Sequence, residues 1–183
     1  MSIRFNTNTR KALEAIIYLA NKKADMTQYY FMKMIFFAEK YHINKYGIPI
    51  IGDRYIKMDN GPVPSFVLDA IRLDGAKLTH DIYEEINKSL DFRKDSKKIH
   101  TSAKRKPDLS FLSSTNLECL DKAFNLCKAK SFDELKNLTH EETAWKKAVR
   151  NRDMDYALFV DDNHPDKEII VADLSDNFGT LVL

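Results

Sequence analysis

The sequence predicts an α+β protein, a predominantly helical single domain with a small antiparallel β-sheet or hairpin. Apolar residues recur at helical spacing along most of the chain, and one short β-forming run lies among glycines and prolines. The 183 residues are 44% hydrophobic and can build one well-packed core. No repeat or low-complexity linker divides them. We therefore predict one domain over residues 1–183, with its core at about 10–150 and an acidic C-terminal extension at 153–183.

Two helices are predicted before residue 47. Asn8 or Thr9 can cap the first, whose apolar residues follow i, i+3 and i+4 spacing until it ends near Lys23. Thr27 can cap a longer and more aromatic helix, which Gly47 ends. The breadth of its apolar face predicts that this second helix lies at the centre of the core.

The following segment is predicted to form a strand, a rigid loop and a helix. The run from Gly47 to Met58 is rich in β-forming residues that glycine and proline interrupt, which suits a short strand with a bend. Six turn-forming residues, Asp59 to Pro64, predict a rigid loop. Ser65 can then cap a helix that Gly75 ends.

The segment from Lys88 to Lys106 is strongly basic. It contains eight lysines and arginines but only two acidic residues, Asp91 and Asp95, which leaves a local excess of six positive charges. Residues 99–106 can form a strand that pairs with the earlier β segment, with lysines on an exposed edge. Three interpretations stay open: a solvated surface, a contact for an acidic protein and a contact for nucleic acid. The acidic residues after Asp153 offer opposite charge within the chain, and the aromatic platform of a single-strand binder is missing.

Capping boxes predict three more helix starts, each with an acceptor and a carboxylate three residues apart. The pairs are Thr115 with Glu118, Ser131 with Glu134, and Thr139 with Glu142. The acidic extension then contains a β-forming run, Glu168 to Val171, and the apolar end at 181–183 is expected to pack as a strand.

The overall charge and the cysteines favour a cytoplasmic protein. The 29 lysines and arginines nearly balance 27 aspartates and glutamates, so the net charge of +2 gives no global attraction to nucleic acid or membrane. No stretch approaches the about 18 uninterrupted apolar residues of a membrane span, and the N-terminus lacks an apolar signal core. Cys119 and Cys127 stand too far apart on one predicted helix to form a disulfide, which fits a reducing compartment.

Patterns that carry catalytic chemistry are missing. None of the five histidines has a histidine partner at metal-binding spacing, and the five glycines form no phosphate-binding loop. His140 and Glu142 could suggest a hydrolase, but a carboxylate in the first turn of a helix is better explained by capping. The single tryptophan, Trp145, is expected to anchor the core. We expect no metal, no cofactor and no enzymatic activity.

Several linked motifs resemble one known family. They are the runs Met34 to His42, Tyr46 to Tyr55 and Asp59 to Ser65, followed in the expected order by Leu112-Ser113 and by Leu138 to Glu141 ahead of Trp145. This arrangement closely resembles the Panacea domain, a family also described as SocA-like or phage-associated GepA-like. The resemblance covers about residues 10–150.

The resemblance implies an antitoxin of a toxin–antitoxin system. Such a protein neutralises a co-encoded toxin by direct protein–protein interaction, and SocA-like members can also deliver the toxin to an AAA+ protease. The family offers no catalytic residue to carry over to this chain. The alternative is a DNA-binding transcriptional regulator in which helix, hairpin and basic segment form a winged-helix-like element, so nucleic acid ranks below protein as a partner.

The candidate residues divide into a structural group and a partner-binding group. The family-motif residues are expected to shape the fold: Gly47, Gly52, Asp53, Arg54, Gly61, Pro62, Pro64 and Trp145. Specificity for a partner is expected on the variable surface around them. The candidates for that surface are Tyr55, Asp59 and Asn60 on the motif frame, and Lys97, Lys98, Lys104 and Arg105 on the basic segment.

Overall fold

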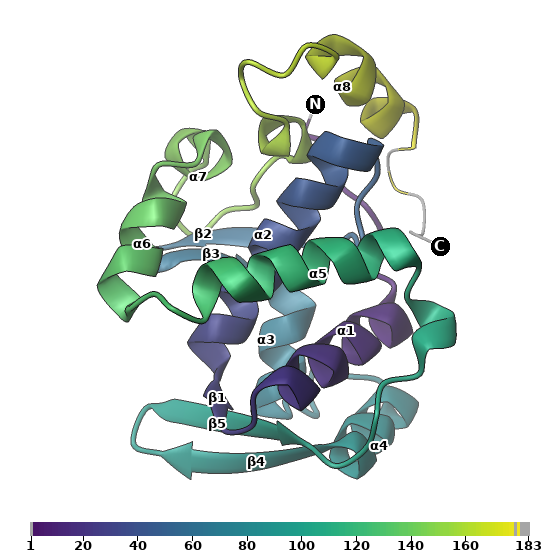
Figure 1. Cartoon of the computed structure of the whole chain (residues 1–183), viewed down its shortest axis with the longest axis vertical. Coiled ribbons are helices and arrows are strands. Elements are labelled where there is room, and N and C mark those ends of the chain that lie inside the picture. Colours follow the sequence, from purple (N-terminus) through teal and green to yellow (C-terminus); the bar gives the residue numbers. More distant parts are fainter. Residues whose placement is uncertain (1, 178, 180–183) are drawn as a thin grey trace.

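Helix α2 (Gln28–Tyr46) runs through the middle of the protein, and the other elements pack around it (Figure 1). The computed structural model describes residues 2–177 and 179. Helix α5 (Ser114–Cys127) crosses α2, while α1 (Thr9–Lys22) and α3 (Ser65–Arg72) pack beside it. Buried residues lie on almost every side of α2 from Phe31 to Ile43, as expected of a helix at the centre of a core. The predicted α+β class is confirmed.

The first two helices begin and end where the sequence predicts. The Asn8 side chain accepts a hydrogen bond of 3.0 Å from the backbone N–H of Lys11, which satisfies one of the free donors at the start of α1. Helix α2 follows Thr27, although the Thr27 side chain makes no capping bond. It ends at Gly47, whose φ of 75° is the left-handed conformation that glycine adopts at low cost.

The motif region forms a hairpin in place of the predicted strand and rigid loop. Strand β2 (Tyr55–Met58) pairs antiparallel with β3 (Gly61–Pro64) across the two-residue turn Asp59-Asn60. The predicted strand from Gly47 to Met58 is therefore wrong in its first half, and the predicted rigid loop contains a strand. The reason is Glu39 of α2, whose buried carboxylate accepts backbone hydrogen bonds from the segment before β2.

A second sheet lies at the opposite end of the protein from the C-terminal helix (Figure 1). Its strands are β1 (Met26–Thr27), β5 (Lys98–Ala103) and β4 (Leu90–Asp95), antiparallel in the order β1-β5-β4. The predicted basic strand is confirmed, but its predicted pairing with the motif hairpin is wrong. Its nearer partner is β4, which follows directly from helix α4 (His80–Ser89) and needs only a short turn to return.

One of the three predicted capping boxes is confirmed. Helix α6 (Phe132–His140) starts at the Ser131–Glu134 box. Helix α5 is capped by Ser113 with Asn116, because the Glu118 carboxylate is bonded to Lys45 and Tyr46. The turn η1 (Leu109–Phe111) precedes it.

The third predicted capping box, Thr139 with Glu142, is wrong because neither residue is in a position to cap a helix with the other. Thr139 lies inside α6, and the carboxylate of Glu142 forms an ion pair with Lys40 of α2. Helix α7 (Thr143–Lys147) follows Glu142 without a side-chain cap.

The acidic C-terminal segment packs against α2 and the N-terminus. The turn η2 (Tyr156–Phe159) buries its aromatic rings in the core, and helix α8 (Lys167–Asp176) packs on η2. The predicted β run Glu168 to Val171 is wrong, since it lies in α8. The apolar end at 181–183 lies outside the described residues.

The acidic segment does not neutralise the basic one. Asp153 pairs with Arg4 at 3.0 Å and Asp161 with Lys40 at 2.8 Å, whereas the β4–β5 hairpin lies at the other end of the structure (Figure 1). That hairpin is thus left without the acidic segment as a partner. Within residues 2–177 and 179, no helix is long and apolar enough to cross a membrane.

Candidate functional site

A groove of about 640 Å³ opens where six segments meet. They are the start of α2, the β2–β3 hairpin, α3, the tip of the β4–β5 hairpin, the start of α6 and the segment after α7, which contributes Asn151. The volume lies within the roughly 300–1,000 Å³ typical of binding pockets. We call this feature the hairpin groove.

The floor of the hairpin groove is apolar. Met32, Val63 and Leu68 form a small buried cluster of their own, and Met58 packs against it. Methionine side chains are flexible and polarisable, so a floor containing two of them can adapt to different apolar side chains.

Aromatic residues form one wall. The rings of Tyr29 and Phe132 lie 4.3 Å apart, and the Tyr29 hydroxyl donates a hydrogen bond of 3.2 Å to the carbonyl oxygen of Phe132. The hydroxyl of Tyr30 donates to the carbonyl oxygen of Lys130 at 2.8 Å. These contacts tie the start of α6 to the start of α2, yet 43% of Phe132 remains exposed at the edge of the groove.

A buried lysine lies beneath the groove. Lys33 is 1% exposed, and its Nζ donates a hydrogen bond of 2.9 Å to the carbonyl oxygen of Pro62 and lies 4.9 Å from the centre of the Tyr29 ring. Burial disfavours the charged form and lowers the pKa of Lys33 to about 7. The charge of Lys33, and with it the electrostatic potential in the groove, therefore depends on pH near neutrality.

The rim of the groove is positively charged. Arg72, Lys97 and Lys98 are exposed, and within the described part of the chain none of their side chains forms an ion pair. Asp59, which is the one acidic residue among the described lining residues, is paired with Arg150 at 2.5 Å. Three cations at the rim are thus available to a partner.

Four of the seven predicted partner-binding residues meet in this groove. Asp59 and Asn60 come from the turn of the β2–β3 hairpin, and Lys97 and Lys98 come from the tip of the β4–β5 hairpin. The two pairs are far apart in the sequence, and only the fold brings them together.

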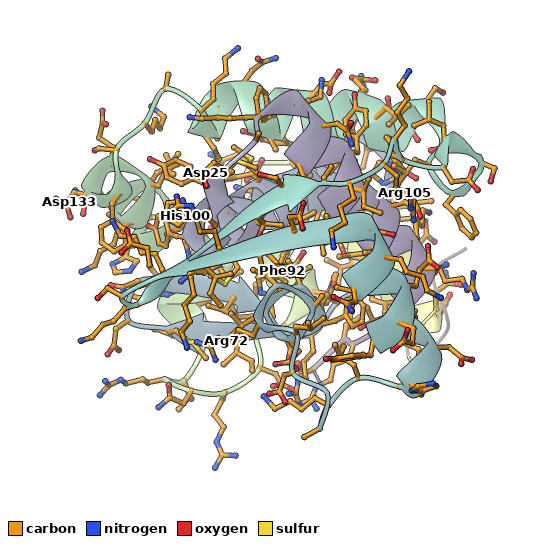
Figure 2. The ribbon with its side chains drawn as sticks, turned by 90° about the horizontal axis from the view of Figure 1, so that it is seen from below. Asp25, Arg72, Phe92, His100, Arg105 and Asp133 are labelled. Carbon is orange, nitrogen blue, oxygen red and sulfur yellow. The ribbon has the colours of Figure 1, made fainter. Side chains whose placement is uncertain are left out.

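The other three candidates lie outside the groove, and one of them, Tyr55, is contradicted as a surface residue. Tyr55 is fully buried, with its ring packed against Phe36, Tyr156 and Phe159, because strand β2 directs it into the core. It offers no surface to a partner. Lys104 and Arg105 lie at the far end of the sheet from its tip, where Figure 2 shows Arg105 well away from His100 and Asp25.

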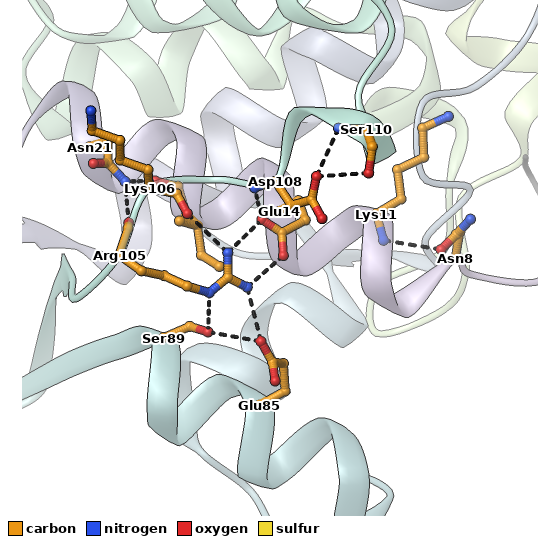
Figure 3. A network of polar contacts seen from close by, with 11 residues as sticks. Asn8, Lys11, Glu14, Asn21, Glu85, Ser89, Arg105, Lys106, Asp108 and Ser110 are labelled. Atoms are coloured by element: carbon orange, nitrogen blue, oxygen red, sulfur yellow. Dashed lines mark hydrogen bonds and ion pairs between the residues drawn. The ribbon is translucent and has the colours of Figure 1, made fainter.

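Lys104 and Arg105 also form ion pairs with carboxylates of the same chain. Lys104 pairs with Asp91 at 3.2 Å. The guanidinium of Arg105 binds both carboxylate oxygens of Glu14 at 2.9 and 2.5 Å, and it reaches Glu85 at 3.1 Å (Figure 3). Arg105 therefore joins α1 to α4 and serves the fold.

The motif residues form the frame that holds the groove. The carboxylate of Asp53 accepts hydrogen bonds from the backbone N–H groups of Phe66 and Val67 at 3.0 and 3.1 Å, and so caps α3 from outside that helix. Burial raises the pKa of Asp53 to about 7, against the lowering effect of those N–H groups. The guanidinium of Arg54 is exposed and reaches Ser65 at 3.3 Å and Asp153 at 3.9 Å.

Gly52 and Trp145 belong to the same frame. The N–H of Gly52, which has a φ of 67°, donates to Glu39 at 2.8 Å. The Nε1 of Trp145 donates to the carbonyl oxygen of Met58 at 3.1 Å, directly behind the groove. Both contacts lie within the fold, and the structural role of these residues stays a prediction.

The side chains that could act in catalysis are either engaged in other contacts or buried. The ring of His140 stacks on Trp145 with 3.7 Å between centroids, while Glu142 pairs with Lys40. Both cysteines are buried, and burial raises the pKa of Cys127 to about 12, which makes it a poor nucleophile. Among the described residues, no group of three or more His, Cys, Asp or Glu side chains could hold a metal ion.

Sequence reasoning missed much of the groove lining. Tyr29 and Met32 belong to the apolar run of one predicted helix, and nothing local distinguishes a residue that lines a groove from one in the core. Phe132 carries no signal beyond its place after the Ser131 cap.

The comparisons with known proteins identify the family. No curated protein and no solved structure matches the chain. The family described as "Antitoxin SocA-like, Panacea domain" matches residues 31–146, which include α2, the motif hairpin and Trp145. This match spans more than half of the 183 residues and contains every residue that we assign to the structural frame, so the chain belongs to the SocA-like Panacea domain family of antitoxins.

Proposed function

We propose that this chain is the antitoxin of a toxin–antitoxin module and neutralises a co-encoded protein toxin by binding it in the hairpin groove. Membership of the antitoxin family supports the role. The observation that carries the choice of site is the convergence of an apolar floor, an aromatic wall and unpaired cations in one groove.

The composition of the groove matches that of protein interfaces. Interface centres are enriched in tyrosine, methionine and arginine, and their energetic hot spots are aromatic or arginine residues in well-packed pockets. Tyr29, Tyr30 and Phe132 provide the aromatic surface, with Met32 below them. Phe132 is the residue of this group that a partner can cover most, because 43% of it is exposed.

Binding alone accounts for this activity, and the proposal includes no catalytic step. Neutralisation then requires a stoichiometric complex, and the toxin regains activity when the complex dissociates. Delivery of the bound toxin to an AAA+ protease is a variant of the same proposal. It predicts that purified toxin is degraded by the host's AAA+ proteases only in the presence of this chain.

The test is co-expression with the adjacent reading frame. Growth should be rescued, and the two products should copurify as a stoichiometric complex by size-exclusion chromatography. Phe132→Ala should weaken the complex, whereas the matched control Phe111→Ala should not, because Phe111 is 37% exposed on η1 and does not line the groove. Rescue without a complex would contradict neutralisation by binding.

DNA binding is the second candidate, favoured by the exposed cations of the β4–β5 hairpin, which directly follows α4. A winged element of this kind contacts phosphates, and its affinity falls steeply with salt. A gel-shift assay with the operator region at low salt separates the two candidates. A salt-dependent shift would support the regulator, and its absence at low salt would exclude it.

A further inference from the structure

Resting on the proposed function, the geometry points to the chemistry of the toxin surface: we propose that the hairpin groove receives an acidic amphipathic helix of the toxin. Apolar side chains of that helix lie on the floor formed by Met32, Met58, Val63 and Leu68. Its carboxylates face the rim cations Arg72, Lys97 and Lys98.

Charge complementarity argues for an acidic occupant. Of the cations of the basic segment, Arg93, Lys104 and Arg105 each have a carboxylate partner within the fold. Lys97 and Lys98 have none among the described residues, and Arg72 adds a third unpaired cation from α3 on the same groove. Lys33 lies beneath the floor and adds positive potential whenever it is protonated. Complementary charges at a rim steer association and select the partner.

The strand edges argue against an added β-strand. A strand would need free N–H and C=O groups along one edge of the groove. Pro62 and Pro64 of β3 have no N–H, and the carbonyl oxygen of Pro62 already accepts the Lys33 hydrogen bond. Strand β3 pairs with β2 along one edge and also contacts α2 and α6. The β4–β5 hairpin meets the groove at its tip, through Lys97 and Lys98, and not along the length of a strand.

A helix satisfies its own backbone and needs only side-chain contacts. The apolar floor is short and surrounded by charge, which matches a few anchors at i, i+3 or i+4 and i+7 with polar residues beside them. Met32 and Met58 can adjust to the shape of such anchors.

The first experiment reverses the rim charge. Lys97→Glu with Lys98→Glu is compared with Lys94→Glu with Lys106→Glu, which changes the net charge equally at exposed residues outside the groove. The probe is the purified product of the adjacent reading frame, titrated at several salt concentrations. We expect the groove variant to bind at least about tenfold more weakly at low salt and with a shallower salt dependence, since rim charges act mainly on association. The control variant should stay within about twofold of the wild type.

The second experiment maps the occupant and does not depend on charge changes. A benzoylphenylalanine at position 132 should cross-link to a helix of the toxin that carries Asp or Glu, while the same group at position 111 should not cross-link. Lysine substitutions of those toxin carboxylates should restore binding to the Lys97→Glu/Lys98→Glu variant.

The outcomes separate the inference from the proposed function. Failure of the wild-type chain to bind the toxin would overturn both. Binding that is equal in the groove and control variants, or a cross-link to a strand or a basic surface of the toxin, would overturn the acidic helix and leave neutralisation by binding in place.

Discussion

The ammonium group of Lys33 donates a hydrogen bond of 2.9 Å to the carbonyl oxygen of Pro62, directly beneath the hairpin groove. The bond joins the central helix α2 to strand β3, which also meet in the apolar cluster that contains Met32 and Val63. A carbonyl oxygen is a weak partner for a buried ammonium, so burial dominates and lowers the pKa of Lys33 to about 7.

Lys33 should make stability rise with pH above neutrality. Its pKa is about 7 in the folded chain and 10.5 in its ordinary state, so between these values the unfolded chain binds more protons. Stability should therefore increase from pH 7 to about 10, by up to ~1.4 kcal/mol per pH unit from this group. Lys33→Met should remove that increment, measured as the difference in urea unfolding free energy between wild type and variant. An identical pH slope in the two proteins would contradict the assignment.

Gly61 should tolerate no side chain. Its φ is +99°, and a Cβ there would lie 2.4 Å from Oγ1 of Thr139 and 2.7 Å from Nζ of Lys33. Gly61→Ala should lower the unfolding free energy by about 2–4 kcal/mol, from backbone strain together with overpacking. Gly47→Ala is the control, because φ is +75° there but no atom lies within 4 Å of the added Cβ, so only about 1 kcal/mol should be lost. Equal losses in thermal or urea unfolding would show that the close approach costs nothing.

Arg105 should affect stability and leave partner binding unchanged. Arg105→Ala removes the partner of the Glu14 carboxylate, which is only 6% exposed, and should cost about 2–3 kcal/mol because Arg105 itself is partly solvated. Lys104→Ala, at an exposed ion pair, should cost less than ~1 kcal/mol. Unfolding free energy and toxin affinity are measured for both variants. A loss of affinity in folded Arg105→Ala would place this residue in the interface after all.

The carboxylate of Asp59 should weaken toxin binding, whereas the cations across the groove should strengthen it. This carboxylate lines the groove, and the proposed occupant is acidic. Asp59→Asn also frees Arg150 from its ion pair, so the variant should bind the toxin a few-fold more tightly at low salt. Asp133→Asn, at an exposed carboxylate next to Phe132 and outside the groove lining, is the control. Weaker binding by Asp59→Asn would mean that the Asp59 carboxylate accepts a bond from the toxin.

Local signals predicted the first two helices well. The bounds of α1 and α2 follow from Asn8, Thr27 and Gly47, because a cap and an apolar stripe are properties of neighbouring residues. The β run in the acidic extension failed for the opposite reason. Ile170 and Leu174, one helical turn apart, are buried in α8, which packs on η2, and this tertiary contact overrides the local β-propensity.

The sequence by itself determined the α+β class and the central helix α2, which depend on residues close together in the chain, and the family, which depends on the order of motifs along it. Only the tertiary structure decided which charged residues are free. Arg105 and Lys97 are both cations of one basic segment, but the fold places Glu14 beside Arg105, whereas none of the carboxylates that the structure describes pairs with Lys97. The charged side chains that can bind a partner are those without an ion-pair partner in the fold. Such pairing depends on distances between segments far apart in the chain, which local sequence patterns do not give.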